Sequence, residues 1–273
     1  MIPSQSLVAS VELTAGLVRQ SPGVRTDPRP TPQSPAEVLA ALLDFSGTVA
    51  LAELLEAPAP QGSPHPAVQS AARELEDKLC RQLDALAARA SKRLAQEAEP
   101  ASAFPPAVLM QRIERVTQGR ASRVPSGQAC ARLARDLGGS LHAALTTCIR
   151  RGQADYATLR AQIAPELRTL GPHAERLEHI DAALQLGIQA KLSGLFERLV
   201  LASELSFEHA CVEACATLSE DFSASQLASW TGPEGWLVRH RQRCERMLLA
   251  FCGHLRRAAE GLVQAAIHAE IAE

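Results

Sequence analysis

The sequence predicts an all-α protein, an elongated helical bundle with three long helices and several short ones. The chain of 273 residues is 46% hydrophobic but only 3% aromatic. Alanine and leucine, the strongest helix formers, supply most of that apolar content. No stretch alternates apolar and polar residues as a half-buried strand does, and no repeat of fixed period is present. The clearest single pattern is residues 234–269, where apolar side chains recur every three or four positions.

Three helices are expected to be long: 67–99, 173–202 and 234–269. At about 1.5 Å per residue each would extend roughly 45–55 Å, so each apolar stripe needs other helices to cover it. The last begins after Gly232 with Pro233 and Glu234, a helix-start signal. Shorter helices are expected at 106–119, 128–151, 155–167, 206–220 and 223–230. Asp155 and Ser206 are the expected starts of the helices at 155–167 and 206–220. Ser223 to Gln226 form a capping box at the start of the helix at 223–230.

Two proline-rich linkers, 21–35 and 58–66, divide the N-terminal part of the chain. Between them, Ser34-Pro35-Ala36-Glu37 is a capping box with proline at the first helical position, so a helix is expected to run to about Glu56. A further short helix is expected over residues 3–20. The predicted domains are therefore 1–66, N-terminal helices with Pro-rich linkers, and 67–273, a helical bundle.

Paired glycines are expected to mark close helix contacts. Gly187 and Gly194 lie two turns apart on one face and would permit a partner helix to approach. Gly138-Gly139 would either bend their helix or admit a close neighbour.

The net charge of −2 gives no global attraction to nucleic acid or anionic lipid. The seven cysteines contain no CxxC pair and fall mostly at apolar helical positions, which indicates a reducing, cytoplasmic environment. No basic residue precedes Arg19, so a secretion signal is not expected. No apolar run reaches the roughly 18 residues of a membrane span.

The order of elements resembles a known family. The helix starting Ser34-Pro35-Ala36-Glu37 continues through Asp44-Phe45-Ser46-Gly47, a middle segment carries Asp155 and Tyr156, and Leu177 to Gln185 precede a last helix led by Trp236. This pattern resembles the uncharacterised bacterial domain-of-unknown-function family 3348 over nearly the whole chain. The resemblance implies partners in a proton-channel-driven envelope complex, because genes of that family lie near those of MotA/ExbB-like and OmpA-like proteins. It implies no functional residue.

Two i,i+4 pairs, Cys211/Cys215 and His240/Cys244, could together bind zinc tetrahedrally. The same spacing describes a buried helix face, and core packing is the favoured interpretation. Glu175, Glu178 and His179 resemble half of a di-iron set, but no second set exists and a solvated face is favoured. No hydrolase, zincin or nucleotide-binding motif is present. No catalytic residue, cofactor or metal is therefore predicted, and the protein is not expected to be an enzyme.

Two groups of residues are candidates for binding a partner. Trp230 and Trp236 bracket a Gly-Pro turn and would either plug the end of the bundle or anchor another protein. The arginines 112, 115, 120, 123, 132 and 135 form a basic run. Of these, Arg112, Arg115, Arg120 and Arg123 are the candidate contact residues, although no aromatic residue lies between them for base stacking.

The expected function is a non-enzymatic scaffold or adaptor subunit that binds other proteins through helix-on-helix burial. A homo-oligomer is compatible with the same mechanism. The alternative is a nucleic-acid-associated helical protein that uses the arginines of residues 112–135, and a helical metalloenzyme ranks below it.

Overall fold

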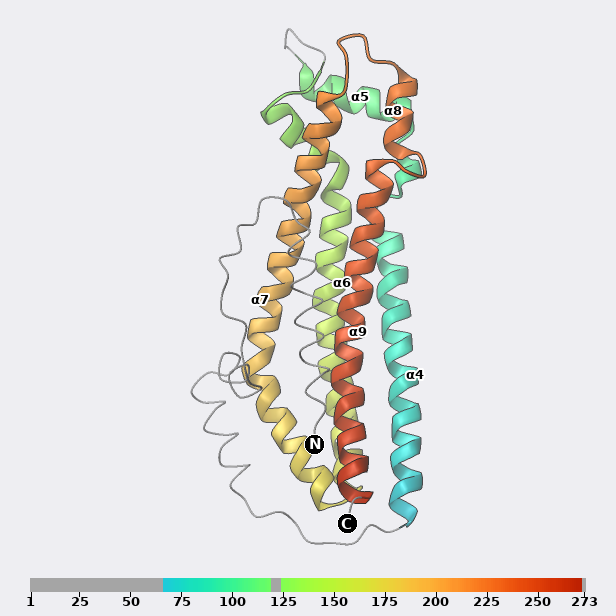
Figure 1. Cartoon of the computed structure of the whole chain (residues 1–273), viewed down its shortest axis with the longest axis vertical. Coiled ribbons are helices and arrows are strands. Elements are labelled where there is room, and N and C mark those ends of the chain that lie inside the picture. Colours follow the sequence, from blue (N-terminus) through green and yellow to red (C-terminus); the bar gives the residue numbers. More distant parts are fainter. Residues whose placement is uncertain (1–65, 119–123, 272–273) are drawn as a thin grey trace. The chain divides into compact units, whose positions relative to one another are not determined.

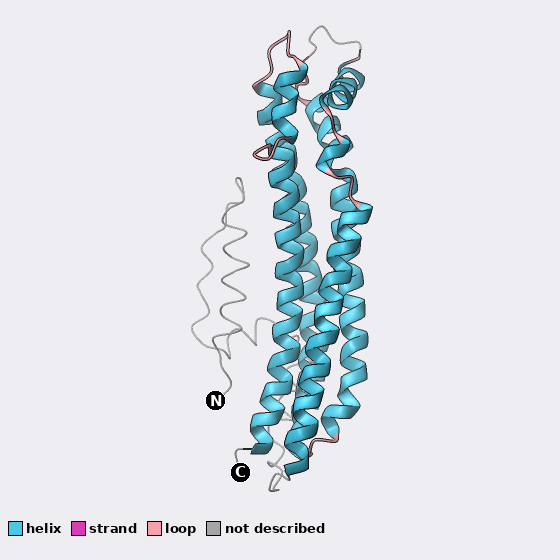
Figure 2. Ribbon diagram, turned by 90° about the vertical axis from the view of Figure 1, so that its right-hand side faces the viewer, coloured by secondary structure: helices cyan, strands magenta, loops and turns pink. Residues whose placement is uncertain are grey.

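The computed structural model describes residues 66–118 and 124–271, and within them the chain is helical, with no strand (Figures 1 and 2). The all-α prediction is confirmed for these residues. The helices expected at 3–20 and 34–56, with both proline-rich linkers, lie outside the described residues. Figure 1 labels the elements, which are α4 Pro66–Glu97, the 3₁₀ turn η1 Ala101–Ala103, α5 Pro106–Thr117, α6 Gln128–Arg168, α7 Pro172–Ala216, α8 Ala224–Thr231 and α9 Trp236–Ile271.

The chain divides into two compact units, and each long helix contributes a segment to both. In the described part of the chain, unit 1 contains residues 66–87, 152–196 and 252–271. Unit 2 contains residues 88–118, 124–151 and 197–251.

Unit 1 is a four-helix arrangement in which side-chain contacts connect neighbouring helices in a closed ring. The contacts are Lys78–Glu166 between α4 and α6, Arg160–Asp181 between α6 and α7, Phe196–His254 between α7 and α9, and Arg256–Asp84 between α9 and α4. Leu75, Leu79, Ile163 and Val263 are among the side chains buried inside it. Apolar stripes from all four helices therefore cover one another, as helical periodicity requires.

Glu178 in α7 differs from its prediction as part of a solvated face. It is only 7% exposed, and its Oε2 accepts a hydrogen bond from Arg168 Nε at 2.9 Å. The paired arginine is what makes burial of this carboxylate tolerable, because an unpaired buried charge is costly.

Unit 2 is built on a core to which the short helices contribute. Leu109 and Ile113 of α5, Leu227 of α8 and Leu133 of α6 are each at 0% exposure in one cluster. α5 packs against α8. The cluster also contains Phe207, Cys211 and Cys215 of α7, together with Cys130 and Leu137 of α6, Trp230 of α8 and Leu237 of α9.

Two expected helix breaks are wrong. α6 continues through Gly152 and Asp155 to Arg168, and α7 continues through Ser203 and Ser206 to Ala216. A single glycine, serine or aspartate costs about 1 kcal/mol or less in a helix, which packing of an apolar face readily outweighs. Pro165 lies inside α6, which continues for only three residues beyond it, and a proline there removes one backbone hydrogen bond of the helix.

The start of α9 is also later than predicted, at Trp236 and not at Pro233. The carbonyl of Gly235 accepts a hydrogen bond from the amide of Arg239 at 3.0 Å, so Gly235 is the N-cap residue of α9. A Cβ on Gly235 would lie 2.2 Å from the carbonyl oxygen of Trp230, so only glycine fits this corner. The short helix α8 has the predicted start, where Ser223 N donates to Gln226 Oε1 at 2.9 Å.

One glycine prediction is confirmed and another is wrong. A Cβ on Gly138 would lie 2.6 Å from Phe207 Cε1, so this glycine admits a close neighbour from α7. A Cβ on Gly194 would meet nothing within 4 Å, so that face of α7 is not in close helix contact there. Gly187 lies among residues whose side chains the structure does not describe.

All seven cysteines lie in the described residues and are free, six of them buried, as their apolar positions predict. Among the described residues, no helix is both long and apolar enough to cross a bilayer.

Candidate functional site

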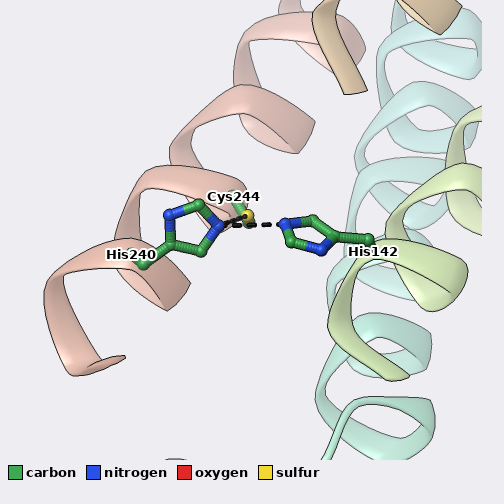
Figure 3. Close-up of side chains that lie close together, drawn as sticks. All are labelled: His142, His240 and Cys244. Atoms are coloured by element: carbon green, nitrogen blue, oxygen red, sulfur yellow. Dashed lines mark hydrogen bonds between the residues drawn. The ribbon is translucent and has the colours of Figure 1, made fainter. Parts of the chain in front are cut away.

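Four polar side chains from three helices converge inside unit 2. His142 comes from α6, Ser203 from α7, and His240 and Cys244 from successive turns of α9. All four are buried, with exposures of 6%, 8%, 5% and 0% respectively. We call this group the His–Cys cluster. Figure 3 shows the two imidazole rings directed at each other, with the sulfur of Cys244 beside the ring of His240.

His240 is the centre of the cluster. Its Nε2 lies 3.0 Å from Nε2 of His142, 3.5 Å from Sγ of Cys244 and 3.5 Å from Oγ of Ser203. Ser203 Oγ is itself 3.5 Å from Cys244 Sγ. The ligand atoms of His142, His240 and Cys244 all lie within 4.8 Å of one another. Nε2 of His240 is therefore surrounded by a second nitrogen, a sulfur and an oxygen, each within 3.5 Å.

Phe207 of α7 forms an aromatic wall beside the cluster. Its ring centroid lies 5.5 Å from that of His142 and 4.6 Å from that of His240, both edge-on. Gly138, one turn before His142 on α6, leaves the room that the Phe207 ring occupies. The orientation of both imidazoles thus depends on a glycine and a phenylalanine.

The surroundings keep the cluster uncharged at neutral pH. Burial lowers the pKa of His142 to about 4. Burial, with the neighbouring His142 and the Arg243 guanidinium, lowers the pKa of His240 to about 3. Burial raises the pKa of the Cys244 thiol, although its contact with Ser203 and the charge of Arg243 act in the opposite direction. With both imidazoles neutral, one Nε2 donates and the other accepts across the 3.0 Å contact.

Of the two i,i+4 pairs for which core packing was favoured over zinc ligation, the structure places only one beside a third possible ligand. His240 and Cys244 join His142, whereas Cys211 and Cys215 lie near Cys130, whose carbonyl is 3.9 Å from Cys211 Sγ. His142 and Ser203 were missed by sequence analysis. His142 is 98 residues from its partner His240 and lies in an apolar helical stripe, so no local spacing indicated it.

The two tryptophans, predicted as plug or anchor, pack against each other in unit 2. Trp230 is 3% exposed, and its ring centroid lies 5.6 Å from that of the half-buried Trp236. Trp236 also contacts Phe207, with centroids 5.0 Å apart. This packing closes the corner between α8 and α9, and Trp230 presents almost no surface to a partner.

The arginine run is only partly described. Arg112 is occupied within unit 2, because it donates to the carbonyl of Asp136 at 2.8 Å and lies 4.8 Å from the ring of Phe104. Arg115 is exposed at the end of α5. Arg120 and Arg123 lie outside the described residues. A continuous phosphate-binding track that includes Arg112 is therefore not free on the described surface.

A second feature lies on the outside of α7 in unit 2. Leu201, Leu205 and Val212 are 54%, 59% and 42% exposed. Their spacings of four and seven residues place them on one helix face. We call these three residues the α7 stripe. The sequence does not distinguish the α7 stripe from the buried face of α7, because apolar residues recur at helical spacing on both faces.

Comparison with protein-family models gives no match for this chain, and comparisons with curated proteins and with solved structures likewise find no significant match.

Proposed function

We propose that this protein is a non-enzymatic helical adaptor that binds a basic amphipathic helix of another protein on the α7 stripe. The observation that carries the proposal is the exposure of three large apolar side chains on one face of a helix. Their burial by a partner helix would be favourable, at about 25 cal/mol per Å² of apolar surface removed from water. Helix-in-groove recognition uses anchors at this spacing.

The charge beside the stripe selects the partner. Residues 197–216 contain four glutamates and a single arginine, Arg198. Glu204 and Glu208 lie along one side of the stripe and Arg198 along the other, and neither glutamate forms an ion pair with another described residue. A partner helix with lysine or arginine beside its apolar face would neutralise them, and complementary charge speeds encounter and fixes orientation.

Other occupants are disfavoured by the same charges. The N-terminal segment 34–56 has four acidic residues and no basic residue, and segment 3–20 has one of each. A second copy of the chain would place two acidic faces together, and like charges across an interface are unfavourable. A basic helix from a different protein therefore fits best.

The test uses two fluorescent peptides of about 20 residues, long enough to form helices. One has a leucine face flanked by lysine, and the other has the same leucine face flanked by glutamate. The proposal expects full-length protein to raise the anisotropy of the lysine peptide and not of the glutamate peptide, with binding weakened by salt. Equal binding of both peptides, or of neither, would contradict it.

Matched variants locate the surface. The double substitution Leu201→Ser and Leu205→Ser should weaken binding of the lysine peptide by about tenfold or more, equivalent to about 1.4 kcal/mol. Leu249→Ser, at a leucine of α9 that is 55% exposed, is the control and should leave binding unchanged. A loss of the same size in the control would mean that binding is not at the α7 stripe.

Two finer proposals rest on sequence alone. The resemblance to family 3348 supports a partner from a proton-channel-driven envelope complex. A photo-crosslinker at position 205, compared with one at position 249, would capture that partner in cells, and the captured segment should be a basic helix. The alternative function, nucleic-acid association, rests on Arg115, Arg120 and Arg123. It requires a mobility shift that is lost when these residues are changed to glutamate.

A further inference from the structure

We propose that the His–Cys cluster binds one zinc ion, with His142, His240 and Cys244 as protein ligands and Ser203 at the fourth position. The ion would join α6, α7 and α9 within unit 2. This inference is independent of the proposed adaptor function, because the cluster is buried and shares no residue with the α7 stripe.

The donor set suits zinc. Zinc in proteins is held by histidine nitrogen, cysteine sulfur and carboxylate or water oxygen, with four ligands in a tetrahedron. The cluster supplies two imidazoles, one thiol and one hydroxyl from four separate side chains. The two imidazoles and the thiol are usual zinc ligands, and the Ser203 hydroxyl would supply the fourth, oxygen donor.

The spacing also suits zinc. For Zn–N of about 2.05 Å and Zn–S of about 2.3 Å, tetrahedral geometry places two nitrogens about 3.3 Å apart and a nitrogen and sulfur about 3.5 Å apart. The measured separations are 3.0 Å between the two Nε2 atoms and 3.5 Å between His240 Nε2 and Cys244 Sγ. The third pair, His142 Nε2 and Cys244 Sγ, lies within 4.8 Å, so the ion is admitted if the two rings separate by a few tenths of an ångström and Cys244 turns towards His142.

Binding exchanges protons for metal in a balanced way. Both Nε2 lone pairs must face the ion, so the ring that donates across the Nε2 contact changes to its Nδ1–H tautomer. The thiol of Cys244 loses its proton and ligates as thiolate, so one proton is released for each zinc bound. Zinc and the thiolate together carry a net charge of about +1. The thiolate therefore reduces the repulsion between the ion and the Arg243 guanidinium.

The surroundings preorganise the ligands. Phe207 packs edge-on against both imidazoles, and α9 places Cys244 one turn after His240, on the same face. With exposures of 8% or less, the four side chains leave no ligand position open to bulk water. The site therefore has the closed form of a structural metal site and not the open form of a catalytic one.

The first test measures zinc by elemental analysis on untagged full-length protein, and then titrates zinc into chelator-treated protein against a colorimetric chelator. About one zinc per chain is expected, with about one proton released per zinc in weakly buffered solution. Cobalt in place of zinc should give a thiolate charge-transfer band and the visible bands of tetrahedral cobalt. Stoichiometry near zero in the titration would overturn the proposal.

Variants assign the ligands. Cys244→Ala should lower zinc affinity by about a hundredfold or more and abolish the cobalt charge-transfer band, and His142→Gln should lower affinity similarly. The matched control is Cys211→Ala, a buried cysteine in the same unit that belongs to the pair Cys211/Cys215. Circular dichroism establishes that each variant is folded. If Cys211→Ala loses zinc and Cys244→Ala retains it, the proposal is wrong.

Discussion

At the scale of single residues, two adjacent glycines of α6 occupy opposite environments. Gly138 faces Phe207, whereas a Cβ on Gly139 would meet nothing within 4 Å. The free energy gained by replacing glycine with alanine in a helix is about 1 kcal/mol for either residue. What distinguishes them is whether the added methyl group has room.

Gly139→Ala is therefore expected to stabilise the protein by about 0.5–1 kcal/mol. Gly138→Ala must displace the Phe207 ring, and overpacking of this kind costs about 1–3 kcal/mol. Urea denaturation of both variants should place Gly138→Ala about 1–3 kcal/mol below Gly139→Ala. Equal stabilities would show that the Phe207 ring moves aside without cost.

The buried histidines predict how stability depends on pH in metal-free protein. Their folded pKa values, about 4 for His142 and about 3 for His240, lie below the unfolded value of 6.5. Below pH 6.5 the unfolded chain therefore binds more protons than the folded one. The stability contributed by the neutral histidines is complete above pH 6.5 and is lost as the pH falls towards 3.

The measurement is the free energy of unfolding of chelator-treated protein between about pH 6.5 and pH 4.5, above most carboxylate titration. Each histidine contributes a slope of up to about 1.4 kcal/mol per pH unit. His142→Gln should reduce the slope, and His209→Gln, at an exposed histidine of α7, should not. An unchanged slope in His142→Gln would mean that His142 is protonated in the fold already.

At the scale of elements, the corner between α8 and α9 depends on Gly235. A Cβ there would lie 2.2 Å from the carbonyl oxygen and 2.5 Å from the carbonyl carbon of Trp230, which are backbone atoms. Neither a rotamer change nor a small side-chain shift relieves such a contact. The chain must instead move where Trp230 packs against Trp236.

Gly235→Ala is expected to destabilise the protein by at least about 2 kcal/mol and to change tryptophan fluorescence, because Trp230 and Trp236 are the only tryptophans of the chain. Gly232→Ala is the control. Its Cβ would approach no atom closer than 3.6 Å, an ordinary contact. If both variants have the parent's emission spectrum and stability, the corner is more adaptable than its geometry indicates.

Helix ends were harder to predict than helix faces. The starts of α5 at Pro106 and α6 at Gln128 agree with the sequence, since proline and glycine act locally there. The helix breaks expected near Asp155 and Ser206 are absent. Packing of the helical residues before and after a weak break signal decides whether the helix ends there. The start of α9 lies at Trp236, after a turn in which Gly235 N donates to the Gly232 carbonyl at 2.8 Å, and sequence spacing does not reveal that turn.

At the scale of the whole molecule, amphipathic periodicity accounts for the all-α fold and for most of the buried leucines. It accounts for little of the candidate site. His240 and Cys244 were paired by their spacing on one helix, but His142 and Ser203 belong to other helices. Only the packing of α6 and α7 against α9 brings those side chains within reach, and long-range contacts of that kind have no local pattern.

Leu255 of α9 tests whether the last helix is a core element of the molecule. It is 6% exposed, within unit 1, in the apolar stripe that predicted the bundle. A carboxylate at this position would be removed from water, and an unpaired buried charge costs more than a cavity. Leu255→Asp should therefore lower the free energy of unfolding by more than about 3 kcal/mol, with loss of helical circular dichroism on mild heating. Leu249→Asp places the same charge on the same helix at a side chain that is 55% exposed, and its melting temperature should stay close to that of the parent. If the two variants melted alike, burial of the α9 stripe would not be what holds the helices together.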